Sequence, residues 1–377
     1  MTGKTTEETA ECDNSFRPFS YIARSMKLRN LWAKGLVFFI TAFSLQSGLQ
    51  GQNFGSSMDM LIKETNARTA ALGGFNVSLQ DDDVQMVNGN PALANGSMKR
   101  SLGMSYNPSL AGIRQYNTAY CDSLPVAGIL FGTVQFLDFG SFRQTDAAGV
   151  ENGNFTASQY AASLGTARRK GNFKLGAALK FSSLQINGLQ ASAILADLGV
   201  SYKHPTKDLS YGLSIRNLGF QAAKFYSDGQ RIPMPLNIQA GFSYKLSHMP
   251  LRLSGTAFYL QETDIQYLDP NTPGKLDANG QLVKEKKKFT EQIARHLCLG
   301  GEFLLNRSFH LRVGYNHLRR KELRTETGAG LTGFSLGFMI NTKPLNLAYT
   351  YSGWQNGTGL HFLSLNLRLQ SFLKKGV

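Results

Sequence analysis

The chain has few charged residues and, beyond its N-terminal region, no long hydrophobic run. Charged side chains make up 17% of its 377 residues, against about 25% in soluble domains. Mean hydropathy is −0.21, and no later apolar stretch approaches the ~20 residues that a membrane helix needs. These shortages exclude a bundle of membrane helices and disfavour an ordinary soluble domain. The length alone allows two soluble domains or one large barrel.

Cysteine is also scarce, with three residues in the whole chain. Cys12 lies before a signal-like segment, so the mature chain would keep Cys121 and Cys298. Two cysteines so far apart form no disulfide framework, and an exported protein with so few does not depend on them. Neither follows the apolar segment closely enough to carry a lipid.

Residue patterns for catalysis and metal binding are missing too. His296 and Cys298 would share one face of a strand, but no CxxC and no second His pair accompanies them, so a metal site is not expected. His361 and Ser364 stand three residues apart and would point to opposite faces of a strand. No GxSxG motif occurs. We predict a protein that is not an enzyme and that holds no metal or cofactor.

Two further patterns imitate binding motifs without completing them. Gly73-Gly74 lacks the GxGxxG or GxxxxGK[ST] frame that holds phosphate, so we interpret it as a helix stop. Asp81-Asp82-Asp83 lacks the spaced oxygens, central Gly and closing Glu of an EF-hand. We expect these three acids to lie in a turn that is exposed to water.

The N-terminal region does contain an apolar run, in the arrangement of an export signal. A basic segment starts at Met26, an apolar core of ten residues follows at 36–45, and small and polar residues continue to Gly51. Ten residues are too few to span a bilayer, so we interpret residues 26–51 as a removed signal peptide. Residues 49–51 and 42–44 are alternative cleavage sites. Residues 1–25 indicate a misassigned start codon or, alternatively, a genuine N-terminal extension.

From about Arg100 the sequence alternates with a period of two until it ends. Between Ile194 and Tyr202, for example, apolar residues occupy one side while Asp197, Gly199 and Ser201 occupy the other. Segments of about ten residues exceed the ~5–6 residues of strands in soluble sheets. Continuation to the chain end is what barrel closure requires. We predict an all-β fold, a transmembrane antiparallel β-barrel over residues 100–377, with a soluble sandwich or jelly roll as the alternative.

At about twenty residues per strand and connection, this region suffices for about fourteen strands. Aromatic residues recur where strands end, as at Tyr106, Tyr202 and Tyr259, which is typical of an interfacial girdle. Long polar connections at residues 141–154 and 261–290 belong on the outer side. The second is charged and is either a partner surface or a solvated loop.

Residues 52–99 precede the barrel and predict a plug-like segment, because a short helix cannot bury its apolar face alone. We expect that helix over residues 52–74, with Ser57 as its N-cap. A strand should follow at Phe75, Val77 and Leu79, and Asn90-Pro91 marks a turn into the barrel.

Basic residues outnumber acidic ones by 40 to 25, which gives a formal charge of +15. The excess is spread along the sequence, and no basic-aromatic motif indicates a nucleic-acid partner. For an exported barrel we attribute it to lipopolysaccharide phosphates or acidic partners, with solvated loops as the alternative.

Residues 67–94 resemble one family of barrels, the PorQ proteins of the type IX secretion system of Bacteroidota. With PorV, these belong to a branch that is similar to the FadL fatty-acid transporters. Weaker agreement follows at residues 137–140, 215–219 and 234–236. The structural signature of this resemblance consists of Gly73, Gly74, Asp81, Asp82, Asp83, Asn90, Pro91 and Ala92.

The resemblance implies a fourteen-stranded outer-membrane barrel that acts as a scaffold. It would anchor a PorZ-like surface protein, together with PorV and the PorU sortase, in a complex that attaches cargo to anionic lipopolysaccharide. One alternative is a FadL-like channel for hydrophobic molecules, which would need a continuous apolar pocket and a lateral opening at a strand kink. The other alternative is a PorV-like cargo shuttle.

Overall fold

The computed structural model describes residues 58–124, 128–226, 229, 231–265, 275–276, 282–283, 289–324 and 330–373. The chain divides into Met1–Gly51 and Gln52–Val377, and all described residues belong to the second unit. The expected signal peptide, the residues before it, Ser57 and most of the connection at 261–290 lie outside the described residues.

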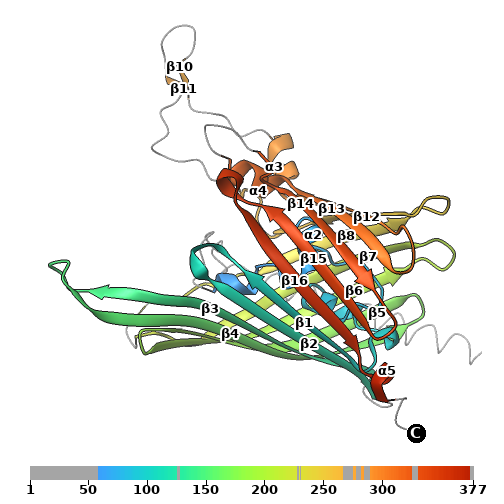
Figure 1. Cartoon of the computed structure of the whole chain (residues 1–377), viewed down its shortest axis with the longest axis horizontal. Coiled ribbons are helices and arrows are strands. Elements are labelled where there is room, and N and C mark those ends of the chain that lie inside the picture. The colour runs from blue at the N-terminus through green and yellow to red at the C-terminus, as the bar shows by residue number, and fades with distance from the viewer. Residues whose placement is uncertain are drawn as a thin grey trace, which may run out of the picture. The chain divides into compact units, whose positions relative to one another are not determined.

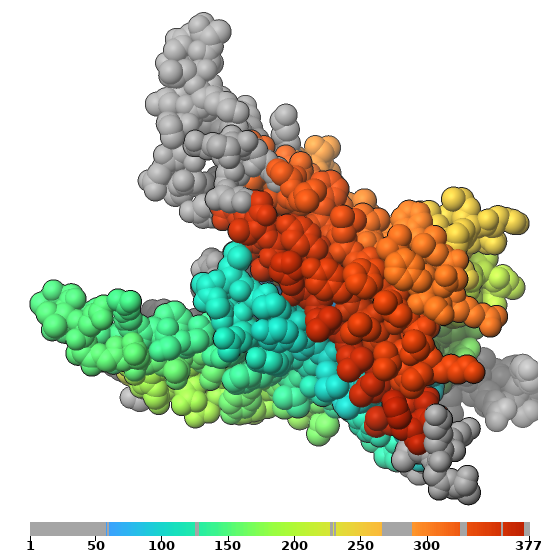
Figure 2. All heavy atoms as spheres, in the orientation of Figure 1, coloured from blue at the N-terminus to red at the C-terminus, as the bar shows by residue number. Residues whose placement is uncertain are grey.

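Fourteen strands form one closed antiparallel barrel, in which strands that follow each other along the chain are neighbours and β1 closes on β16 (Figure 1). This confirms the predicted fold and strand number. In Figure 2 the cyan start of the barrel and its red end lie against each other. No described helix is long and apolar enough to cross a membrane. The strands are β1 (Ser101–Pro108), β2 (Arg114–Leu124), β3 (Gly128–Thr145), β4 (Glu151–Lys170), β5 (Phe173–Ile186), β6 (Leu189–Lys203), β7 (Leu209–Ala223), β8 (Asn237–Lys245), β9 (Leu251–Ala257), β12 (Leu297–Phe303), β13 (Phe309–Asn316), β14 (Phe334–Asn341), β15 (Leu345–Gly353) and β16 (Gly359–Arg368).

Alternation along each strand separates a lipid face from a lumen face. On β6, Ile194 and Leu198 are exposed on the outside of the barrel, whereas Leu195, Asp197 and Gly199 are buried within it. Large apolar side chains cover the outer face throughout, because this surface contacts hydrocarbon and not water. The lumen face carries small and polar residues, as the sequence predicts.

The two ends of the barrel differ in their connections. One end, which we call the short-turn end, joins strands through residues 171–172, 204–208, 246–250, 304–308 and 342–344. Ser101 and Arg368 pair at this end, so β1 starts and β16 finishes there. Short turns face the periplasm in bacterial outer-membrane barrels, and longer loops face outward.

The opposite end carries the longest connections, at residues 224–236, 258–296 and 317–333, beside turns as short as 187–188 and a projecting hairpin. β3 and β4 continue past the other strands as paired strands (Figure 1), so their connection is only residues 146–150. The expected long polar loop at 141–154 is therefore wrong. Phe142 and Phe155 stack across the hairpin with ring centroids 5.4 Å apart, which supports pairing where a loop was expected. At the same end lie η6 (Leu110–Gly112), α3 (Phe289–Arg295), α4 (His317–Glu322) and η7 (Gln355–Gly357), while β10 (Lys275–Leu276) and β11 (Leu282–Val283) pair only with each other; α5 (Gln370–Leu373) follows β16 at the short-turn end.

Residues 58–99 fill the lumen, and we call them the plug (Figure 1). The expected single helix is wrong, because the described part folds as short separate turns. The expected strand at 75–79 is also absent: Asn76 and Ser78 are as deeply buried as Val77 and Leu79. This segment is enclosed by the barrel, so it has no solvent-exposed face, and its polar and apolar side chains are buried alike. The plug elements are η2 (Asp59–Leu61), α2 (Ala67–Ala71), η3 (Val84–Asn88), η4 (Pro91–Leu93) and η5 (Gly96–Met98).

Glycines on the lumen face let the plug approach the wall closely. A Cβ atom on Gly199 of β6 would lie 1.9 Å from Asn90 Oδ1, and one on Gly212 of β7 would lie 1.9 Å from Val77 O. A Cβ on Gly314 of β13 would lie 2.4 Å from Ala71 O. Side chains at these positions would displace the plug.

We predict that Gly199→Val loosens the plug, because the added methyl groups overlap Asn90 and such overpacking costs about 1–3 kcal/mol. Trypsin should then cleave the plug faster at Lys63 and Arg68 while the strands stay resistant. Ala162→Val is the matched control, since Ala162 faces outward. Equal cleavage rates for the two variants would contradict the close approach.

Candidate functional site: the charged network that fixes the plug

Three neighbouring strands place an Arg-Glu-Arg row on the lumen face. Glu302 on β12 is in register with Arg252 on β9 and Arg312 on β13. Arg252 Nη1 lies 3.0 Å from Glu302 Oε2, and Arg312 Nε lies 2.9 Å from Glu302 Oε1. The carboxylate is 1% exposed, so it is withdrawn from water and held by guanidinium groups.

Arg68 of α2 joins this row to the plug. Its Nε and Nη2 atoms donate to Glu302 Oε1 and Oε2 at 3.0 and 3.1 Å, a bidentate pair. Its Nη2 atom also lies 2.5 Å from Asp81 Oδ2. Arg252 reaches the same Asp81 oxygen at 3.3 Å. Plug and wall therefore share one buried network of alternating charges.

The three acids at 81–83 do not form a turn that is simply exposed to water, and that expectation is wrong. Burial by itself raises the pKa of Asp81, but the charges of Arg68 and Arg252 outweigh it and lower this pKa to about 2. Asp82, 39% exposed at its side chain, lies 2.5 Å from Arg368 at the end of β16. Asp83 is buried, caps η3 by accepting from Gln85 N, and accepts from Asn366 Nδ2 at 3.1 Å. Burial raises the pKa of Asp83 and Arg68 partly offsets this rise.

Asn90, Pro91 and Ala92 dock the plug on the opposite wall. Asn90 is fully buried; its Oδ1 accepts from Ala92 N at 2.9 Å, and its Nδ2 donates to Val77 O at 2.8 Å. The same amide reaches Val200 O on β6 and Leu213 O on β7 at 3.3 and 3.4 Å. Pro91 starts η4, which packs on β4, β5 and β6. The turn is thus part of the plug's attachment.

Gly73 and Gly74 end α2 and turn the chain toward the wall. Their φ angles are 91° and 101°, in the left-handed region that glycine adopts without strain. Asn316 Nδ2 on β13 donates to Gly73 O at 2.8 Å. The helix stop predicted at these residues is confirmed.

A second attachment holds the start of the plug against β7. Arg216 Nη2 and Asn217 Nδ2 donate to Leu61 O at 3.1 and 3.3 Å. Asn217 forms a bulge with a φ angle of 59°, and its backbone N–H donates to Asp197. Lys180 Nζ lies 2.7 Å from Asp197 Oδ2, and both are buried. Glu64 also pairs with Arg319 of α4.

The other candidate residues do not come together. His361 is exposed on the outer face and Ser364 is buried in the lumen, which confirms their predicted opposition. Cys121 and Cys298 are free thiols, as expected from their spacing. Tyr259 follows β9 and packs edge-on against Phe75 of the plug, so its expected place in a girdle is wrong. Within the described ranges, no three His, Cys, Asp or Glu residues gather as metal ligands.

Sequence reasoning missed the other members of the charged network. Glu302 and Arg312 stand at lumen-facing positions of strands with few other polar residues, and Arg68 lies in a small-residue helix. A charge inside an apolar period-two strand costs free energy unless it is paired. Charged residues at these positions therefore indicate buried ion pairs, although the sequence pattern does not identify which residue pairs with which.

No family model and no curated protein sequence matches this chain. Among solved structures it is similar to a FadL homologue of Pseudomonas aeruginosa, at 10% identity and a TM-score of 0.45, over 81% of this chain and 98% of that one. It is also similar to a mutant of the TodX monoaromatic hydrocarbon channel and to the CymD monoaromatic hydrocarbon channel. Both are 12% identical with TM-scores of 0.46, over 81% of this chain and 97% or 98% of theirs. At these values the likeness bears on neither substrate nor mechanism.

Arg68→Ala should loosen the plug, because it removes the bidentate pair that joins the plug to Glu302 and one of the two guanidinium partners of Asp81. Breaking a buried pair from one side costs about 3–5 kcal/mol. Plug amides should then exchange hydrogen at least about a hundredfold faster by mass spectrometry, given 1.36 kcal/mol per tenfold. Arg143→Ala removes the exposed Arg143–Glu151 pair as a control and should change little. Unchanged plug protection in Arg68→Ala would refute the network's role.

We predict that Asp81 makes a contribution to the free energy of unfolding that is lost in acid. It belongs to the plug and to none of the strands, and its pKa falls from 3.8 when free to about 2 when folded. Its contribution is therefore complete above pH 3.8 and is lost as the pH falls toward 2. The difference in thermal midpoint between wild type and Asp81→Asn should be largest at neutral pH and vanish near pH 2. A difference that stays constant with pH would contradict this assignment.

Proposed function

We propose that this protein is an outer-membrane barrel closed by its own plug, serving as an anchor for other proteins and not as an open pore. The observation that carries the proposal is the buried Arg68–Glu302 pair, which joins the plug to the wall from the inside. Attachments on other walls, through Asn90 and through Arg216, support it. A plug held from several sides suits a permanent closure better than a mobile gate.

In its finer form the proposal is a PorQ-like component of a type IX secretion system in a Bacteroidota-like bacterium. Such a barrel would hold a PorZ-like surface protein, PorV and the PorU sortase while cargo is joined to lipopolysaccharide. The signature residues support this reading because each has a task in seating the plug. The β3–β4 hairpin and the helices α3 and α4 project from the end opposite the short turns, where a surface partner could contact them (Figure 1).

The FadL-like channel is the second candidate, and one feature of β7 favours it. Beyond Arg216, β7 pairs with β6 but no longer with β8, because β8 begins at Asn237. The bulge at Asn217 thus stands where this edge of β7 loses its partner strand. Residues 231–236 cover that edge, since Pro235 O accepts from Asn217 Nδ2 and Ile232 N donates to Gln221. A channel would have to move this segment. No comparable feature favours the cargo shuttle.

Deletion of the gene in its native host separates these roles. For the anchor, cargo should lose its processing and its attachment to lipopolysaccharide, and an affinity-tagged barrel should retrieve a large surface protein. Cargo processing and attachment to lipopolysaccharide should both be restored by the wild-type gene and by the Ala162→Val variant, because Ala162 faces lipid. Intact cargo processing together with lost uptake of long-chain fatty acids would overturn the anchor and support the channel.

A further inference from the structure

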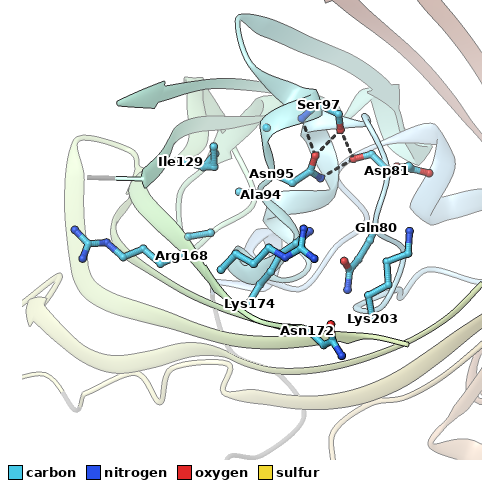
Figure 3. Close-up of a pocket in the computed structure, with 13 residues that line it drawn as sticks. Gln80, Asp81, Ala94, Asn95, Ser97, Ile129, Arg168, Asn172, Lys174 and Lys203 are labelled. Atoms are coloured by element: carbon cyan, nitrogen blue, oxygen red, sulfur yellow. Dashed lines mark hydrogen bonds between the residues drawn. The ribbon is translucent and has the colours of Figure 1, made fainter. Parts of the chain in front are cut away.

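Basic residues that appear scattered in the sequence gather at the short-turn end of the barrel. Five face the lumen there, because each occupies an inward position at the end of its strand: Arg169 on β4, Lys174 on β5, Lys203 on β6, Lys245 on β8 and Arg252 on β9. Arg168 occupies an outward position, and its side chain points away from the others (Figure 3). The fold thus concentrates a charge that the sequence spreads out.

These cations line cavities between plug and wall. One cavity of about 460 Å³ lies between Arg169, Lys174 and Lys203 on the wall and Gln80, Asn95 and Ser97 of the plug (Figure 3). A neighbouring cavity of about 210 Å³ has Lys203, Lys245 and Arg252 in its lining. The larger volume falls within the range of small-molecule sites, roughly 300–1,000 Å³.

Little negative charge offsets these cations. Asp81 is the acid that lines the larger cavity, and it is already engaged by Arg68 and Arg252. Asp208 lines the smaller one. Arg169, Lys174 and Lys203 line the same cavity, so three positive charges share one space. Like charges held together at one mouth are unfavourable unless an anion joins them.

We propose that this cavity binds a phosphate group through Arg169, Lys174 and Lys203, with the uncharged plug residues Gln80, Asn95 and Ser97, whose side-chain donors are engaged within the protein, on its other side. Phosphate fits because ammonium and guanidinium groups together satisfy its several acceptor oxygens. Short turns face the periplasm, so the phosphate comes from a soluble periplasmic compound or from an inner-leaflet lipid headgroup. Lipopolysaccharide, in the outer leaflet, lies at the other end. The site is independent of whether the barrel anchors partners.

Calorimetry with inorganic pyrophosphate tests the site on the full chain in detergent and phosphate-free buffer. The variant Lys174→Gln/Lys203→Gln should bind at least tenfold more weakly than wild type. Lys170→Gln/Lys207→Gln is the matched control, because both lysines lie at the same end but are exposed outside the cavity. It should stay within twofold of wild type. Gel mobility before and after heating verifies that each barrel is folded.

Native mass spectrometry with phosphatidylglycerol, against phosphatidylcholine, supplies the lipid arm. Binding of pyrophosphate that depends on the inward lysines supports a soluble ligand. Retention of phosphatidylglycerol alone, with the same dependence, supports a headgroup in the same site. Equal weakening by both double variants would mean attraction to net charge only and would overturn the proposal. Absence of binding in both arms would overturn it as well.

Discussion

The contact on which this structure depends is the bidentate pair between Arg68 of the plug and Glu302 of the wall. Both groups are buried, so each would carry a large desolvation penalty without the other. Arg252 and Arg312 hold the carboxylate from the neighbouring strands, and Asp81 returns a negative charge to Arg68. The bidentate pair also restricts the relative orientation of the two groups, because a guanidinium group and a carboxylate form two parallel hydrogen bonds. The pair therefore sets the position of the plug and also holds the plug in that position.

The plug backbone does not take part in the sheet, so its peptide groups need other hydrogen-bond partners. Plug peptide groups find partners on the lumen face: Ala67 N donates to Ser364 Oγ at 2.8 Å, and Ala67 O accepts from Thr350 Oγ1 at 2.6 Å. Ser210 Oγ donates to Ser78 O at 2.8 Å. Lumen glycines such as Gly199 leave room for these approaches. Small and polar inward residues are thus the complement of the plug, which explains why they alternate with apolar ones on strands that face lipid.

The barrel could be predicted because its determinants are local, whereas the plug's are not. Period-two alternation marks strands such as β6 directly, and strand length points to a membrane span. Ala67 and its partner Ser364 lie 297 positions apart. From the sequence, Asp81, Asp82 and Asp83 are interpreted as a solvated turn, because partners such as Arg252 and Arg368 come from distant segments. Propensity rules assume that a helix or turn has a solvent side, and the lumen offers none.

The same network also makes the short-turn mouth asymmetric. Asp81 takes part of the charge of Arg252, so the β9 side of the mouth is partly neutralised by the plug. On the β4–β6 side the plug presents the uncharged residues Gln80, Asn95 and Ser97 together with Asp81, whose charge is engaged by Arg68 and Arg252. Positive potential therefore stays where Arg169, Lys174 and Lys203 meet neutral hydrogen-bonding groups. The plug fills the lumen and, by the same placement, leaves one side of the short-turn mouth positive.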